Sequence, residues 1–174
     1  MTRRALNSPT PVCEGQGTLL NSRPSDGAIL DSAASFRISQ VGTARFFPSE
    51  RFARQASEAF AEHARRIRER VPGADVRHVG GTSVPGLLTT GDVDLHVRVE
   101  PADFLEARSA LYDLYEPLYQ DRWRESAYFF DPDSDPRVEV ALTEIGNIED
   151  LHHGEAWRRI ADDPHLVERY NALN

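Results

Sequence analysis

Two carboxylates near the middle of the chain have a spacing that suits metal chemistry. Asp92 and Asp94 are separated by one residue, and alternate residues of a β-strand point to the same face about 6.5–7 Å apart. Two carboxylates placed in this way can converge on one or two hard divalent ions, and Mg²⁺ prefers oxygen ligands. The pair therefore predicts a metal site on one face of a strand.

A glycine-containing loop at residues 80–86 precedes this pair and supplies a second kind of chemistry. Gly80 and Gly81 have no Cβ, so backbone N–H groups can approach a triphosphate closely. The hydroxyls of Thr82 and Ser83 add donors that need no net positive charge. Taken alone the loop is an ordinary turn. Ten residues separate Gly81 from Asp92, however, and the loop and the aspartate pair together predict phosphate binding.

Four histidines are weaker candidates. His78 is expected to orient the loop through a hydrogen bond rather than to act as acid or base. His96 continues the face of the aspartate pair and could touch a nucleotide, although a single histidine there is more often a surface residue. The neighbouring His152 and His153 do not predict a metal site, because adjacent positions of a helix face different ways.

The elements that must position these residues follow from hydrophobic periodicity. Residues 92–99 alternate polar and apolar side chains, which predicts a half-buried strand with Asp92, Asp94, His96 and Arg98 on one face. The other predicted strands cover residues 75–79, 118–123, 127–130 and 137–142, with a short one at 36–41. The predicted helices cover residues 52–71, 101–115, 148–161 and 164–173. This order favours an α+β fold, with α/β as the alternative, in which helices flank one small mixed sheet.

Composition limits the classes of protein to which the chain can belong. Its 174 residues, 40% hydrophobic and 28% charged, are typical of one folded domain. Residues 1–35 are predicted to form a flexible N-terminal extension, and residues 36–174 the domain. Cys13 is the single cysteine, which suits a reducing compartment.

Charge and hydropathy indicate the expected surroundings. Twenty Lys and Arg against 28 Asp and Glu give a net charge of −8, so nucleic acid is an unlikely partner. No apolar run approaches the ~20 residues that span a bilayer, and none follows the N-terminus as in a secretory signal. We expect a cytoplasmic protein without a membrane partner.

The two motifs together resemble a known pattern. Residues 79–81 (VGG) and 92–94 (DVD) fit the signature of the DNA polymerase beta-like nucleotidyltransferase superfamily. Residues 78–87 (HVGGTSVPGL) resemble the HVGSTSVPGL string of the GrpB family. A C-terminal helix pair of that family is similar to residues 157–160 and 164–173. The resemblance spans about residues 38–173 and implies a nucleotidyltransferase-like fold.

The chain departs from the family pattern at two places. Thr90 stands where members commonly have Lys just before the aspartate strand, so a phosphate-binding cation is missing there. Residues 138–142 stand where members often have His-x-His. The wider superfamily has a third carboxylate ligand in this region, which makes Glu139 the candidate. Its rivals are Glu144, Asp131 and Glu125.

The resemblance implies metal-assisted nucleotidyl transfer. Asp92, Asp94 and Glu139 would hold Mg²⁺ or Mn²⁺, with Glu139 alternatively acting as general base. Gly81 and Ser83 would hold the β- and γ-phosphates of a nucleoside triphosphate, with ATP as the first candidate. The acceptor would be a small molecule or a protein side chain. The alternatives are a module that binds a nucleotide or phosphorylated metabolite without turnover, and a scaffold with a vestigial pocket.

Overall fold

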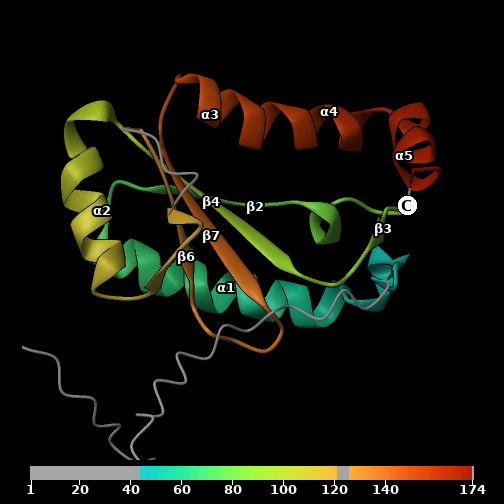
Figure 1. Cartoon of the computed structure of the whole chain (residues 1–174), viewed down its shortest axis with the longest axis horizontal. Coiled ribbons are helices and arrows are strands. Elements are labelled where there is room, and N and C mark those ends of the chain that lie inside the picture. The colour runs from blue at the N-terminus through green and yellow to red at the C-terminus, as the bar shows by residue number, and fades with distance from the viewer. Residues whose placement is uncertain (1–43, 121–125, 174) are drawn as a thin grey trace, which may run out of the picture. The chain divides into compact units, whose positions relative to one another are not determined.

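A five-stranded mixed sheet organises the computed structural model, which describes residues 44–120 and 126–173 (Figure 1). The strand order is β2-β4-β7-β6-β5, with β4 parallel to β7 and the other neighbours antiparallel. The strands are β2 (Asp75–Val79), β4 (Val93–Val99), β5 (Glu116–Leu118), β6 (Ala127–Asp131) and β7 (Val138–Glu144). A separate two-stranded sheet pairs β1 (Phe47–Pro48) with β3 (Leu88–Thr89). The predicted small mixed sheet of an α+β fold is confirmed.

Helices flank this sheet. The α-helices are α1 (Ala53–Arg70), α2 (Phe104–Tyr112), α3 (Ile148–Asp150), α4 (Ala156–Asp162) and α5 (Pro164–Asn171). Short 3-10 turns occur at η1 (Ser49–Arg51), η2 (Gly81–Ser83) and η3 (Pro101–Asp103), and a π-helical turn, η5 (Leu151–Glu155), joins α3 to α4. In Figure 1, α1 and the α3–α4 segment run along opposite sides of the sheet. Within the described residues, no helix is both long enough and apolar enough to cross a membrane.

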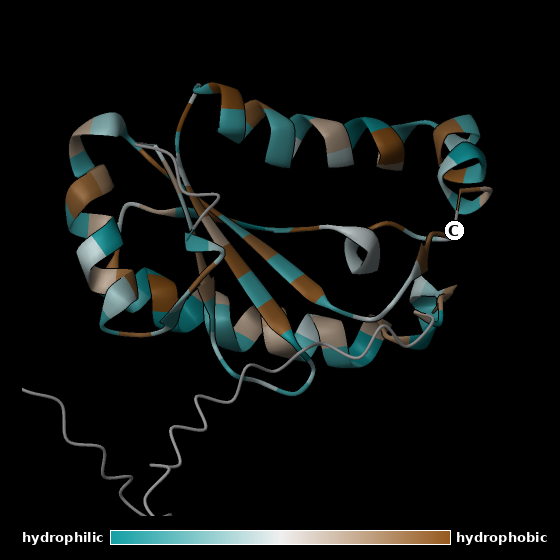
Figure 2. Cartoon of the chain, viewed as in Figure 1, coloured by the Kyte–Doolittle hydropathy of each residue, from teal (hydrophilic) through white to brown (hydrophobic). Residues whose placement is uncertain are grey.

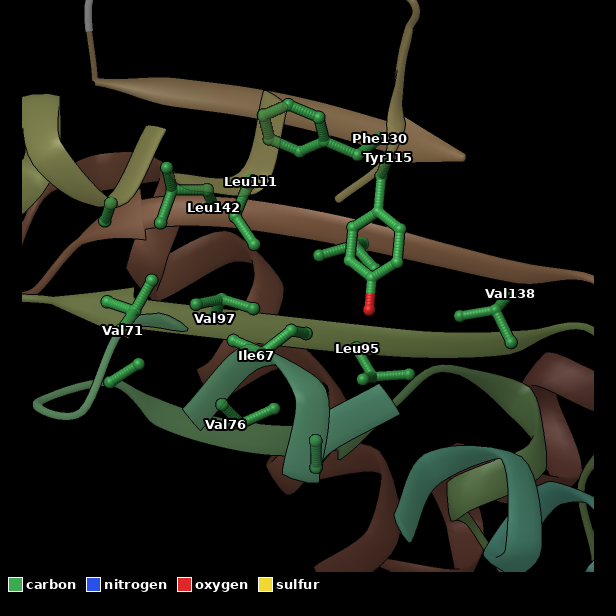
Figure 3. Close-up of a cluster of buried hydrophobic side chains, with 14 of the residues drawn as sticks. Ile67, Val71, Val76, Leu95, Val97, Leu111, Tyr115, Phe130, Val138 and Leu142 are labelled. Atoms are coloured by element: carbon green, nitrogen blue, oxygen red, sulfur yellow. The ribbon is translucent and has the colours of Figure 1, made fainter. Parts of the chain in front are cut away.

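The main core lies between one face of the sheet, α1 and α2. Alternation places Val93, Leu95, Val97 and Val99 on this face, and each is at most 1% exposed. Figure 2 shows the alternation as changing colours along the strands. Figure 3 shows side chains from α1, from β4 and from the segment around α2 meeting in one cluster, among them Ile67, Leu95 and Leu111. Burying such side chains contributes about 1.5–3 kcal/mol each, so this face fixes the register of β4.

The C-terminal helical segment covers the other face of the sheet. A β-carbon on Gly154 would lie 3.6 Å from the ring of His96, and the rings of His96 and His153 are 5.6 Å apart. His96 is fully buried, and its Nε2 lies 2.8 Å from the Thr143 hydroxyl oxygen. The interpretation of His96 as a surface residue is therefore wrong, because the helices add a second layer that strand alternation alone does not reveal.

Ion pairs fasten that segment to the sheet. Arg98 on β4 binds Asp150 through two nitrogens, one of them at 2.8 Å from Oδ2, and binds Asp75 Oδ2 at 2.7 Å. Hydrogen bonds from Arg98 lower the pKa of Asp150 to about 2. Asp150 also accepts a hydrogen bond from the Gly146 N–H at 2.8 Å. The polar face of β4 is thus partly used to hold the C-terminal helices.

Several predicted boundaries shift in the structure. The helix predicted at residues 101–115 is a 3-10 turn followed by α2, and the one at 148–161 is interrupted by the π-helical turn. The strand predicted at 137–142 extends to Glu144. The predicted extension at residues 1–35 and strand at 36–41 lie outside the described residues. Residues 121–125, which include the end of the strand predicted at 118–123, also lie outside the described residues. In the described part, β5 pairs with β6 only from Glu116 to Leu118.

Candidate functional site

The loop after β2 approaches β4 closely at Gly80, where any other residue would force the loop or the neighbouring strand residue to move. Gly80 has φ +77°, a left-handed conformation that L-residues rarely adopt. A β-carbon at this position would lie 1.8 Å from Asp94 Oδ2. The loop backbone therefore lies directly against a carboxylate of the predicted site.

A chain of hydrogen bonds fixes the rest of the loop. The Thr82 hydroxyl donates to the Asp92 carbonyl oxygen at 2.9 Å, and His78 Nε2 lies 3.0 Å from the same hydroxyl oxygen. Because the hydroxyl proton is used by Asp92, His78 Nε2–H is the donor in the second bond. The expected orienting bond of His78 is thus present. The Thr82 hydroxyl joins loop to strand, and the Ser83 hydroxyl donates to the Gly80 carbonyl at 2.7 Å.

Parallel pairing of β4 and β7 brings the predicted carboxylates together. Asp94 is the register partner of Glu139, and neighbouring strands lie about 4.8 Å apart. Burial, and then the negative charges of Glu139 and Asp92, raise the pKa of Asp94 to about 7. Among the described residues, no donor forms a hydrogen bond with the Asp94 carboxylate. The site therefore concentrates negative charge that its own side chains only partly balance.

The rivals of Glu139 lie elsewhere. Glu144 is paired with Val99 at the opposite end of β7, and Asp131 is paired with Glu116. Glu125 lies outside the described residues. Of the described candidates, only Glu139 is in register with Asp94.

Two residues that the sequence analysis did not select complete the site. Arg137 Nη2 lies 2.7 Å from Glu139 Oε1, and the Tyr119 hydroxyl donates to the same oxygen at 3.0 Å. The Arg137 carbonyl accepts a hydrogen bond from Val93 N–H, which places this arginine beside the start of β4. The positive charge of Arg137 lowers the pKa of Asp94, but burial and the charges of Glu139 and Asp92 raise that pKa by more. Arg137 thus provides a cation in the site, although Thr90 has none.

Two small cavities open onto the Asp94–Glu139 pair. The first, about 170 Å³, is lined by Phe46, Gly81, Leu88, Thr89, Thr90, Asp92, Asp94, Glu139, Trp157 and Tyr170. The second, about 180 Å³, is lined by Val79, Asp94, Leu95, Phe129, Glu139, Ala141, His153 and Trp157. Trp157 lines both, and its ring packs 5.8 Å from that of Tyr170. The aromatic residues of α4 and α5, like Arg137, gave no signal in the sequence beyond their place in the C-terminal motif.

This site belongs to a chain whose sequence matches one family over most of its length. Residues 51–174 match the family described as GrpB protein. The chain belongs to the GrpB family. A UPF0157 protein from Vibrio cholerae is 23% identical over 130 residues, which are 74% of this chain and 69% of that protein.

A solved structure of a GrpB protein has the same fold. The crystal structure of the conserved protein GrpB from Enterococcus faecalis matches with a TM-score of 0.55 at 20% identity, covering 68% of this chain and 74% of that one. The Cid1 poly(U) polymerase with MgGTP bound gives a TM-score of 0.44 at 13% identity, over 74% of this chain and 40% of that one. The resemblance to the GrpB family is confirmed.

The carboxylates of this GrpB chain suit a magnesium ion that also binds a substrate. Within residues 44–120 and 126–173, no group of three or more His, Cys, Asp or Glu is arranged to hold a metal ion. Mg²⁺, however, is usually bound by one or two carboxylates together with substrate phosphates rather than by a cage of protein ligands. Asp92 and Asp94 supply oxygen donors in a site whose negative charge Arg137 only partly balances. They fit such an ion, and the ligand role of Glu139, which pairs with Arg137, stays a prediction.

Proposed function

We propose that this GrpB-family protein is a Mg²⁺-dependent nucleotidyltransferase that moves a nucleoside monophosphate from a nucleoside triphosphate to a small-molecule acceptor. One observation carries the proposal. The loop at Gly80 packs against Asp94, so a phosphate-binding turn and a carboxylate pair occupy one cavity. A glycine turn or a carboxylate pair alone is common in proteins. Binding of a metal together with a triphosphate requires the two to lie side by side.

The first cavity binds the triphosphate. It is lined by Gly81 of the loop and by Asp92 and Asp94. These two carboxylates would hold Mg²⁺, which when bound would supply positive charge to balance the charge that develops on the leaving pyrophosphate. Arg137, the residue just before β7, adds positive charge, and it exchanges its partner Glu139 for a phosphate oxygen.

The transfer step uses Glu139 as proton acceptor. An acceptor hydroxyl oxygen forms a bond to the α-phosphorus, and the bond between that phosphorus and the oxygen bridging to the β-phosphate breaks. Pyrophosphate leaves with the bonding electron pair, and the hydroxyl proton passes to the Glu139 carboxylate. Arg137 and Tyr119 both bind Oε1 of Glu139, so Oε2 is the oxygen that takes this proton.

Calorimetric titration of ATP, GTP, CTP and UTP, each with and without Mg²⁺, tests the binding half of the proposal. We expect at least one nucleotide to bind only with Mg²⁺ and to lose binding in the Asp92→Asn/Asp94→Asn variant. Asparagine keeps the shape of an aspartate side chain, so we expect the variant to fold, including at Asp94 beside Gly80. Binding that is equal in this variant would remove the proposed site.

A binding module without turnover is the second candidate function. It is favoured by Thr90, which replaces the lysine common in the family, and by the pairing of Glu139 with Arg137. Pyrophosphate release separates the two functions. Release by the wild-type chain with any acceptor, and its loss in Glu139→Gln, supports the transferase. Metal-dependent nucleotide binding without release across an acceptor library supports the binding module.

A further inference from the structure

The second cavity touches the reactive carboxylates without touching the phosphate loop. It shares Asp94, Glu139 and Trp157 with the first cavity. Gly81 and Asp92 line the first cavity and do not line the second. A molecule bound there meets the carboxylates while leaving the loop free for a triphosphate, which is the arrangement that a second substrate needs.

The walls of the second cavity suit a planar ring. Phe129, Trp157 and His153 contribute three ring systems, and the Phe129 and His153 rings lie 5.5 Å apart at 58°. Val79 and Ala141, the register partners of Asp94 and His96, add apolar side chains on the same face of the sheet as Asp94. An apolar cavity of ~150 Å³ holds a benzene ring, so about 180 Å³ accommodates one ring with a short substituent.

The charges around the cavity exclude one class of ligand. Asp94 and Glu139 are acidic, and none of the described lining residues is Lys or Arg. Burial lowers the pKa of His153, which favours its uncharged form. A carboxylate or phosphate on the ring would be repelled, whereas a hydroxyl can donate a hydrogen bond to Asp94 or Glu139.

We propose that the second cavity is the acceptor site, and that the acceptor is a non-anionic alcohol carried on a single aromatic ring. The ring packs between Phe129 and Trp157, and the hydroxyl points to the Asp94–Glu139 pair. This assignment rests on the proposed transferase function, because a bound alcohol is an acceptor only if the protein transfers a group to it. The cavity's preference for a ring alcohol can be tested without any catalysis.

Fluorine NMR with two matched probes tests the preference directly. 4-Fluorobenzyl alcohol carries the predicted ring and hydroxyl, and 4-fluorobenzoate carries a carboxylate on the same ring. The full chain is expected to bind the alcohol and not the benzoate. Ala141→Leu fills the cavity and is expected to weaken alcohol binding by about tenfold or more. Ala161→Leu, the same change at an exposed position of α4, is expected to leave binding unchanged.

A parallel titration with MgATP separates this inference from the proposed function. We expect Ala141→Leu to bind MgATP as the wild type does. Loss of MgATP binding in that variant would mean that the cavity holds the nucleobase, and it would overturn the acceptor assignment. Alcohol binding by a wild-type chain that binds none of the four nucleotides with Mg²⁺ would remove the transferase and retain the ring site. MgATP binding without alcohol binding would remove the ring site and leave the proposed transferase function standing.

Folding of the cavity variant needs its own control. Phe129→Ala removes a ring from the cavity at a partly exposed strand position and does not add bulk. If Ala141→Leu unfolds at a lower temperature, Phe129→Ala must still weaken the alcohol. Unchanged alcohol binding in Phe129→Ala would contradict the proposal.

Discussion

Gly80 and Asp94 are in such close contact that a β-carbon on the glycine would lie 1.8 Å from the Asp94 Oδ2 atom. The loop and the carboxylate pair therefore form one structural unit rather than two neighbouring features. Any side chain at position 80 must displace either the loop or the carboxylate. This dependence makes the site sensitive to a change that adds only one methyl group.

Gly80→Ala is expected to impair both stability and metal-nucleotide binding. Gly80 has φ +77° and ψ −175°, a conformation in which an alanine costs on the order of 1–3 kcal/mol, and displacement of Asp94 adds to this cost. Gly86→Ala is the matched control, because Gly86 has the same φ of +77° and its β-carbon would meet only a Val167 methyl at 4.0 Å. Urea unfolding and MgATP titration of both variants measure the difference. Equal effects in the two variants would show that the contact with Asp94 is unimportant.

The Thr82 hydroxyl is expected to stabilise the loop through its bonds to Asp92 and His78. Thr82→Val keeps the shape, removes the hydroxyl and leaves the Asp92 carbonyl without this donor. The free energy of unfolding should fall by about 1–3 kcal/mol. Thr82→Ser retains the hydroxyl and should recover most of the loss. Thermal unfolding compares the three proteins, and a valine variant as stable as the serine variant would contradict the role.

Arg137 is expected to contribute to triphosphate binding and little to folding. Its side chain is 48% exposed, so loss of its pair with Glu139 should cost at most ~1 kcal/mol of stability. Loss of a charged hydrogen bond to phosphate should weaken MgATP binding by about 1.5–3 kcal/mol, or roughly 10- to 150-fold, in Arg137→Ala. Arg54→Ala on the outer face of α1 is the control. MgATP binding unchanged in Arg137→Ala would place the phosphates elsewhere.

Acid is expected to weaken the attachment of the C-terminal helices. The pKa of Asp150 is about 2 in the folded chain, against an ordinary value of 3.8 for an aspartate. Its stabilising contribution is therefore complete above pH 4 and is lost as the pH falls toward 2. The loss is about 2 kcal/mol, since one pKa unit corresponds to ~1.4 kcal/mol.

Urea unfolding at steps between pH 5 and pH 2 measures this contribution. Asp150→Asn should be less stable than the wild type at pH 5, and it should lack this part of the pH dependence. Asp162→Asn, which removes an exposed partner of Arg158, is the control and should keep the wild-type profile. Parallel profiles for the wild type and Asp150→Asn would refute the assignment.

The local elements of the fold were predictable because single strands and helices carry their own periodicity. The alternation of residues 92–99 gave both the strand and the side that faces the core. The spacing of loop and aspartate pair likewise predicted that they would be neighbours, which the Gly80–Asp94 contact confirms. Glu139 was selected by resemblance, and the parallel register of β4 and β7 places it beside Asp94.

Other parts of the site depend on contacts between distant segments that have no local signal. Arg137 enters the site because β7 runs parallel to β4, a pairing that neither strand's sequence encodes. His96 is buried by the turn around Gly154, 58 residues away in the sequence. Trp157 reaches the carboxylates because Arg98 and Asp150 anchor the C-terminal helices over the sheet. Such relationships arise from tertiary packing and required the structure.

Electron paramagnetic resonance of Mn²⁺ tests the central claim most directly, because Mn²⁺ reports its own binding. The protein is titrated with Mn²⁺ in the presence of α,β-methylene-ATP, in which the bond to be broken is blocked. The account predicts that the wild type binds Mn²⁺ together with the nucleotide analogue and that Asp92→Asn/Asp94→Asn does not. Equal binding of Mn²⁺ and the analogue by both proteins would contradict a metal-nucleotide site at the aspartate pair.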